Sequence, residues 1–241
     1  MCGRFTLTTR DFRQLAAALD AEDADDAFAL YRPRYNIAPT DPHWIVREKQ
    51  ERRELLPATW GLVNSWAPDA KGAARQINCR AETALRRPAF RDAFVRRRCV
   101  VPADGFFEWT GSQQARRPLW FHEPHGDLLL FAGLYETWTD PATATRHRTF
   151  TIITTGANPL MAPVHDRMPV VLRPDDIADW LHVPSRDAEA YAARLAPLLR
   201  PPPEDLLVAT PVSARVNSVK NDDPGCLAPA GDEPVAAPRL L

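Results

Sequence analysis

Short apolar runs separated by proline set the strongest limit on the fold of this chain. Its 241 residues include 24 prolines, and proline interrupts both helices and central strands. The runs between them are rich in branched and aromatic residues and are bounded by Pro, Gly or Asp, which is typical of short strands. We expect strands at residues 44–46, 55–60, 99–101, 119–121, 128–131, 150–154, 170–172 and 206–209.

Helical periodicity is confined to a few segments. Residues 8–11 have the pattern of a capping box, and apolar residues then recur at helical spacing from Phe12 to Leu19. Many short strands with few helices predict an α+β fold built on a curved, mostly antiparallel sheet. One domain is expected over residues 1–226, followed by a flexible Ala- and Pro-rich tail over residues 227–241. The remaining helices are expected at residues 81–85, 90–97, 174–181 and 187–199.

Composition excludes several classes of protein. The chain is 45% hydrophobic and 25% charged, close to the average of soluble proteins. No apolar run approaches the ~20 residues of a transmembrane helix, and no apolar signal segment follows Met1. We therefore expect a cytoplasmic protein without a membrane partner.

Nearly every cation in the chain is an arginine. The net charge is only −1, but several arginines gather between residues 75 and 98. Such clustering would give a locally basic face that binds nucleic acid despite a neutral total. The alternative is that genome composition favours arginine over lysine. The lysines are Lys49, Lys71 and Lys220.

Cysteine and histidine spacing gives no sign of a metal site or of another cofactor. The four cysteines form no C-x-x-C pair, and the six histidines form no pair at ligand spacing. Cys2 is distinctive because it follows the initiator methionine. Removal of Met1 would leave an α-amine and a thiol on adjacent carbons, with ordinary pKa values of about 8 and 8.5. This pair could cleave an amide or close a thiazolidine ring on an aldehyde, or Cys2 could simply be a small residue.

Seven short motifs follow one another along the chain, and together they resemble one family. In order and spacing they are similar to the SRAP family, the abasic-site processing proteins once labelled SOS response-associated peptidases. The resemblance spans Cys2 to about Asp223. The motifs are Cys2-Gly3-Arg4-Phe5, Arg34-Tyr35-Asn36-Ile37-Ala38-Pro39, Trp60-Gly61-Leu62 with Ser65-Trp66, Asn78-Cys79-Arg80-Ala81-Glu82-Thr83, Gly105-Phe106-Phe107-Glu108-Trp109, His165-Asp166-Arg167-Met168-Pro169 and Val219-Lys220-Asn221.

The resemblance implies a partly open β-barrel-like core with peripheral helices and a protein that crosslinks itself to abasic sites in single-stranded DNA. Cys2 would form the bond after Met1 is removed, and Asn78 would hold the reactive N-terminus. Glu108 would deliver the proton that opens the abasic sugar to its aldehyde. His165 would shuttle protons around the amine and the opened sugar. A lyase side activity is also expected.

The resemblance also implies a DNA-binding groove. Arg80 and Arg167 would grip phosphates through their planar forks, with Arg4 as a weaker candidate. Trp66 would stack on a base. Residues that would line the groove are Asn36, Pro39 and Thr154. The protein is expected to act as a monomer, associated with the nucleoid when bound to DNA, and no replication-fork partner can be identified. Trp60 and Trp109 could equally be core residues.

Three departures from the family pattern and three rival functions stay open. Cys79 stands where Ala is usual, and Asn64 and Ala67 replace residues that are often Pro and aromatic, which puts the stacking in doubt. One rival is an N-terminal-nucleophile amidohydrolase, although no Asn in the chain precedes Gly to form its oxyanion pair. The others are a peptidase limited to its own N-terminus and a non-covalent reader of damaged DNA.

Overall fold

A ring of five strands forms the centre of the molecule. The computed structural model describes residues 2–24, 27–112 and 115–231. Within them, neighbouring strands pair antiparallel in the order β11-β10-β7-β4-β5, and parallel pairing of β11 with β5 closes the ring at Thr149–Thr59 and Phe150–Trp60. The α+β fold with a barrel-like core is therefore confirmed. The ring consists of β4 (Pro42–Lys49), β5 (Arg52–Trp60), β7 (Arg98–Ala103), β10 (Leu129–Thr139) and β11 (Arg146–Gly156).

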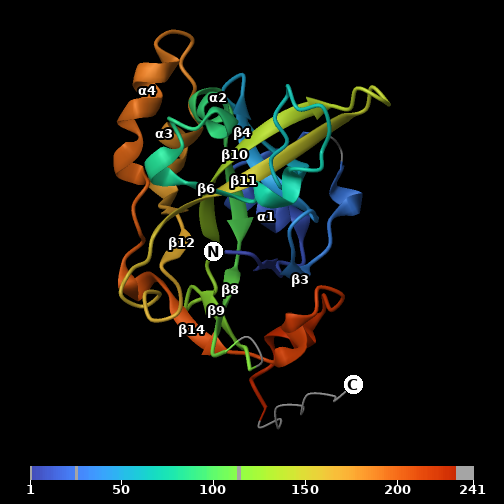
Figure 1. Ribbon diagram of the computed structural model, residues 1–241, viewed down its shortest axis with the longest axis vertical. Helices are drawn as coiled ribbons and strands as arrows, with labels where there is room; N and C mark the ends of the chain where they lie inside the picture. The colour runs from blue at the N-terminus through green and yellow to red at the C-terminus, as the bar shows by residue number, and fades with distance from the viewer. Residues whose placement is uncertain (1, 25–26, 113–114, 232–241) are drawn as a thin grey trace.

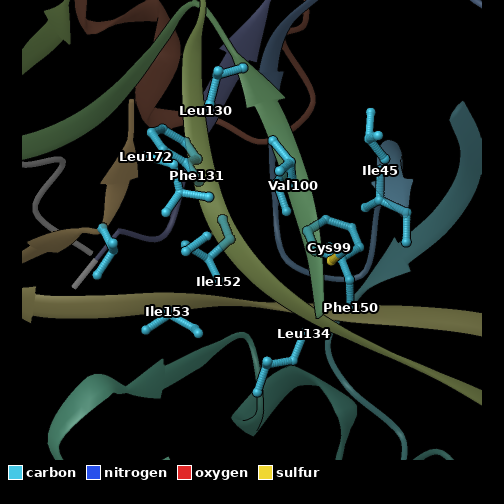
Figure 2. Packing of buried hydrophobic residues seen from close by; sticks show 14 of the residues in the cluster. Ile45, Cys99, Val100, Leu130, Phe131, Leu134, Phe150, Ile152, Ile153 and Leu172 are labelled. Carbon is cyan, nitrogen blue, oxygen red and sulfur yellow. The ribbon is translucent and has the colours of Figure 1, made fainter. Parts of the chain in front are cut away.

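The apolar runs of these strands fill the core. Every residue of β7 is buried, as expected for a strand covered on both faces. Figure 2 shows Val100, Phe131, Phe150 and Ile152 converging from three strands of the ring. Gly133 on β10 permits this packing, because a Cβ there would lie 2.8 Å from Val101 and 2.9 Å from the Cys99 sulfur.

A second, antiparallel sheet lies next to the barrel. The chain passes from β7 to β8 through the single residue Asp104. The Asp104 carboxylate accepts hydrogen bonds from the hydroxyl groups of Thr6 and Thr8, the latter at 2.6 Å, and so fixes the beginning of the chain at this junction. In Figure 1 the chain begins in the middle of the view, above β8, β9 and β14. The sheet has the order β14 (Val208–Pro211), β9 (Arg117–His122), β8 (Gly105–Thr110), β1 (Phe5–Leu7) and β3 (Arg34–Ile37).

Short strands at the end of β11 bring distant motifs together. β6 (Asn78–Arg80) runs parallel to β11, with Asn78 opposite Ile152 and Arg80 opposite Thr154. β12 (Arg167–Pro169) runs antiparallel to the same end of β11, with Arg167 opposite Gly156. The two other short strands are β2 (Glu22–Asp23) on β5 and β13 (Val171–Leu172) on β10.

Helices cover the outside of the barrel. Figure 1 shows α2, α3 and α4 grouped together at the upper end of the molecule. Within the described residues, no helix is long and apolar enough to cross a membrane. The helices are α1 (Phe12–Ala18), α2 (Pro88–Arg96), α3 (Ile177–Leu181) and α4 (Ala188–Arg194).

Local details differ from the sequence expectations. The cap of α1 is Asp11, whose carboxylate accepts from the Arg13 N–H at 2.8 Å, so residues 8–11 do not form the expected box. Residues 81–85 form only a 3-10 turn at Ala81–Thr83. The helix expected over 187–199 ends at Arg194 and continues as a 3-10 turn that contains Pro197, because proline cannot continue an α-helical hydrogen-bond ladder. The strand expected at 206–209 lies two residues later.

The last described residues remain attached to the domain. The Ala230 N–H donates to the carbonyl of Pro211, and Pro229 pairs with Val212. Backbone pairing thus continues three residues beyond Leu227, where the tail was expected to begin. Residues 232–241 of that tail lie outside the described residues.

Candidate functional site

Cys2 lies at the centre of the candidate site, between β1 and β6. Its side chain is completely buried. The Asn78 side-chain nitrogen donates a hydrogen bond to the Cys2 carbonyl oxygen at 2.8 Å, and Asn78 itself is fixed by the pairing of β6 with β11. The Asn78 carbonyl oxygen Oδ1 is buried without a hydrogen-bond partner among the described residues. This oxygen can therefore accept a hydrogen bond from a group close to the N-terminus.

Glu108 is the acidic group whose charge acts on the Cys2 thiol. It lies on β8, which pairs directly with β1, and only 6% of its surface is exposed. Burial first, and the negative charge of Glu108 second, hold the pKa of the Cys2 thiol well above its ordinary value. The thiol is therefore protonated at neutral pH, in contrast to the partial ionisation that an ordinary pKa would give. Nucleophilic attack requires a nearby base, and Glu108 is placed to act as one.

His165 lies in the turn before β12, and its contacts are with neighbours in that turn and at the start of β12. Its backbone N–H donates to Met161 at 3.0 Å. Its ring nitrogen Nδ1 accepts the Arg167 N–H at 2.9 Å and lies 2.9 Å from the Asp166 carboxylate. Acceptance at Nδ1 assigns the proton of the neutral ring to Nε2, whereas the protonated ring would donate to Asp166.

The two arginines expected to grip phosphates lie in different environments. Arg80 is exposed at the end of β6, and its guanidinium forms no hydrogen bond or ion pair within the described part of the chain. Arg167 is largely buried and forms a two-point ion pair with Glu82, at 2.6 and 2.9 Å. Its terminal nitrogen also donates to the Thr154 carbonyl at 2.5 Å. Only Arg80 presents an open fork.

Asn36 and Thr154 do not line a groove, and this corrects the sequence expectation. Both side chains are fully buried. The Asn36 amide nitrogen donates to the carbonyl oxygens of three residues in the 216–221 loop, at distances of 2.7 to 3.3 Å. Thr154 faces inward from β11 and contacts Cys79 and Arg167. An alternating strand does not reveal which of its faces a distant loop covers, so the pattern could not exclude burial.

Arg4 supports the same loop. Its guanidinium donates to the Asn36 side-chain oxygen at 2.7 Å and to the Val216 carbonyl at 3.0 Å, and lies 5.8 Å from the centre of the Trp109 ring. The Trp109 indole N–H in turn donates to Asn217 at 2.7 Å. Arg4 therefore stabilises the 216–221 loop.

The aromatic candidates separate clearly. Trp66 is 70% exposed, in the loop after β5, and could present a stacking face. Trp60 is a core residue, fully buried with its indole N–H on the Ile77 carbonyl at 2.9 Å. Trp109 and Pro39 are half-buried. Cys79 is buried beside Asn78 on β6.

Sequence reasoning did not assign a role to Glu82, although it lies within one of the quoted motifs. A carboxylate two residues after an arginine was the only local signal. Its partner Arg167 is 85 positions away, and the structure alone brings the two together. Among the described residues, no cluster of His, Cys, Asp and Glu could hold a metal ion.

Comparisons with known proteins agree on one family. The family model described as SOS response associated peptidase (SRAP) matches residues 1–219. The abasic site processing protein YoqW of Bacillus subtilis (strain 168) is 37% identical over 227 residues, which cover 93% of this chain and 97% of YoqW. The abasic site processing protein HMCES of Gallus gallus is 32% identical over 233 residues, which cover 83% of this chain and 67% of HMCES.

Solved structures share the fold. A crystal structure of a protein from Bacteroides thetaiotaomicron matches with a TM-score of 0.82 at 24% identity, over 95% of this chain and 100% of that one. A phage-related protein from Bordetella bronchiseptica matches with a TM-score of 0.65 at 26% identity, over 89% of this chain and 95% of that one.

Proposed function

This chain belongs to the SOS response associated peptidase (SRAP) family, and we propose that it processes abasic sites in single-stranded DNA by bonding to them through Cys2. The relatives named as abasic site processing proteins support the lesion as the target. The observation that carries the chemistry is the surroundings of Cys2: its carbonyl is held by Asn78 at 2.8 Å, and the charge of Glu108 acts on its thiol.

The proposed reaction begins after removal of Met1. Glu108 takes the proton of the C1′ hydroxyl and delivers one to the ring oxygen of the closed abasic sugar, which opens to an aldehyde at C1′. The α-amine of Cys2 condenses with this aldehyde, and an imine and one water molecule form. The thiol then adds across the C=N bond, so that sulfur bonds to C1′ and the thiol proton goes to nitrogen. The product is a five-membered thiazolidine that joins protein and DNA.

Burial of the reacting groups favours ring closure over escape. The imine and the thiol belong to the same residue, and such intramolecular attack can reach an effective molarity on the order of 10⁵ M. The thiol is held protonated by its surroundings, so attack on the imine requires its proton to be taken as the bond forms. Glu108, a carboxylate after ring opening, takes the thiol proton and passes it to the imine nitrogen.

A lyase activity belongs to the same intermediate. The imine makes the C2′ hydrogen acidic, and its removal by His165 or Glu108 would eliminate the 3′ phosphate and cut the strand. Fast ring closure suppresses this path, because it consumes the imine. We therefore propose crosslinking as the main outcome and strand cleavage as the minor one.

The test is a denaturing gel with a single-stranded oligonucleotide that contains one abasic site. Wild-type protein should give a heat-stable adduct, and mass spectrometry of its N-terminus should find Met1 removed. An oligonucleotide with a tetrahydrofuran in place of the abasic sugar has no aldehyde and should give no adduct. A full yield of adduct from protein that retains Met1 would refute the thiazolidine chemistry.

Replacement of the nucleophile distinguishes the rival functions. Cys2→Ala keeps an α-amine after Met1 removal, so its imine should be trapped by borohydride while the heat-stable adduct disappears. A non-covalent reader would give neither product with wild-type protein. An adduct that persists in Cys2→Ala without borohydride would assign the bond to another nucleophile, with Cys79 beside Asn78 as the first candidate.

A further inference from the structure

The Arg167–Glu82 ion pair occupies the atoms that a DNA phosphate would need. The terminal nitrogens of Arg167 donate to the two carboxylate oxygens of Glu82 at 2.6 and 2.9 Å. A carboxylate and two phosphate oxygens present the same fork to a guanidinium. Glu82 therefore meets Arg167 in the way that a phosphate would.

Few donors of Arg167 remain once this pair is formed. A guanidinium carries five N–H bonds. Two point to Glu82 and a third to the Thr154 carbonyl. The Nε atom is buried and has no hydrogen-bond partner within the described residues, so a phosphate cannot approach it. The fifth N–H, the second on Nη1, is left over, so a phosphate can bind both terminal nitrogens of the fork only if Glu82 leaves.

Glu82 is the partner that can move. Its side chain is 53% exposed, whereas that of Arg167 is 12% exposed. Arg167 is anchored through Thr154 and through its backbone N–H on His165. Glu82 lies on a single 3-10 turn after β6, and hydrogen bonding from Arg167 lowers the pKa of its carboxyl, so it is charged at neutral pH. Partly exposed ion pairs contribute little free energy, and this one can open readily.

We propose that Glu82 is an internal substitute for a DNA phosphate, which closes the Arg167 fork in the DNA-free protein and is displaced when a strand binds. The inference rests on the proposed function, in which Arg167 contacts the strand. Glu82 lowers the affinity for every single strand equally, damaged or not. Undamaged DNA then dissociates faster, while an abasic strand is retained by its covalent bond. Glu82 in this way limits occupancy of the site by intact DNA.

The test measures equilibrium binding without chemistry. The probe is a labelled single-stranded oligonucleotide with a central tetrahydrofuran, which cannot form an imine. Glu82→Gln keeps the shape of the side chain but removes its charge, and we expect binding about three- to tenfold tighter than wild type. Glu82→Asp keeps the charge and should remain close to wild type.

The salt dependence of the binding constant tests why Glu82→Gln binds DNA more tightly. Each phosphate contact to a single strand contributes about −0.7 to the slope of log K against log salt. In wild type, the Glu82 released by DNA recruits a cation and offsets the counterion that Arg167 liberates. Glu82→Gln should therefore steepen the slope by up to about 0.7.

A matched control separates this effect from a general loss of negative charge. Glu189 on α4 forms an ion pair with Arg91 on α2 and is similarly exposed, and these helices lie at the end of the molecule shown uppermost in Figure 1. Glu189→Gln makes the same change of charge and should alter neither affinity nor slope. In an Arg167→Gln background, Glu82→Gln should likewise give no gain.

Two results would overturn the inference. Unchanged or weaker binding by Glu82→Gln would mean that Glu82 positions Arg167 for DNA and does not compete with it. A gain that persists in the Arg167→Gln background would mean that Glu82 acts by simple repulsion. Both results leave wild-type crosslinking intact, whereas failure of the proposed function would remove the wild-type adduct itself.

Discussion

Two parts of the candidate site are built in opposite ways: the Cys2 pocket, formed by Cys2, Asn78 and Glu108, and the exposed face formed by Arg80 and Glu82. Cys2, Glu108 and Asn78 lie on or beside paired strands, and the first two are almost fully buried. Arg80 and Glu82 lie where β6 ends, exposed to solvent on a short turn. The pocket is held by backbone pairing and short hydrogen bonds. The face is held by one ion pair that solvent weakens.

This difference in burial suggests a division of roles, in which the pocket carries out the reaction and the exposed face binds DNA. A buried pocket keeps a nucleophile protonated and aligned until a substrate supplies the partner, because exclusion of water strengthens each electrostatic contact. An exposed face contributes affinity that depends on salt and is easily exchanged. Changes in the pocket should therefore alter rates without altering binding, and changes on the face should do the reverse.

The largest effect should follow from Glu108→Gln, which tests the pocket. The amide keeps the shape but cannot deliver a proton to the sugar or accept one from the thiol. General acid–base catalysis typically contributes about 10²- to 10⁴-fold, so we expect crosslinking to slow by that factor in a gel time course. Binding of the tetrahydrofuran oligonucleotide should change less than about twofold. A rate within about twofold of wild type would contradict the role of Glu108.

The next effect concerns the support of the 216–221 loop by Asn36. Asn36→Ala would leave the loop carbonyls of Val216, Ser218 and Asn221 without their shared donor. Each lost hydrogen bond contributes about 1 kcal/mol net, and the substitution also removes the bond from Arg4, so we expect the free energy of unfolding to fall by about 3 kcal/mol in a denaturant titration. Asn64 is a matched control, because it is buried but makes one long bond of 3.5 Å to Gln76. An equal loss in Asn64→Ala would contradict the special role of Asn36.

Asn36 also marks how far the sequence could predict the structure. The five strands of the ring could be located from their apolar runs, such as residues 99–101, whereas the strands β1, β3, β6 and β8 were not predicted. The motifs predict a reactive set of Cys2, Asn78, Glu108 and His165, and in the structure Asn78 donates to Cys2 and the charge of Glu108 acts on its thiol. The burial of Asn36 depends on a loop about 180 residues later in the chain, which no local pattern encodes.

The same limit applies to pairs that only the fold creates. Arg167 carries the expected fork, but its closure by Glu82 depends on β6 and β12 meeting the same end of β11. The raised pKa of Cys2 has the same origin, because burial and the position of Glu108 cause it. Sequence motifs predict which groups take part. They do not say which of those groups are already occupied or desolvated.

The third prediction is a pH dependence that belongs to the pocket. Because burial and Glu108 raise the pKa of the Cys2 thiol, the thiolate fraction stays small and grows about tenfold per pH unit until the pH reaches that pKa. Alkylation of Cys2 in the native protein, followed on its N-terminal peptide by mass spectrometry, should rise steadily from pH 7 to pH 9.5. The urea-unfolded protein should reach half of its maximal rate near pH 8.5 and level off above that pH. The same profile in the native protein would contradict a raised pKa.

The smallest effect should come from the exposed face. Arg80 forms no ion pair within the described part of the chain, so Arg80→Gln removes one free phosphate contact and leaves no unpaired partner behind. We expect binding of the tetrahydrofuran oligonucleotide to weaken about three- to fivefold and its salt slope to become shallower by about 0.7. At saturating DNA the crosslinking rate should remain that of wild type, because the arrangement around Cys2 is unchanged. Arg91→Gln on α2 is the remote control for charge. A slower crosslinking rate at saturating DNA would show that Arg80 acts on the reaction itself. Arg80 would then belong with the Cys2 pocket and not with the exposed face.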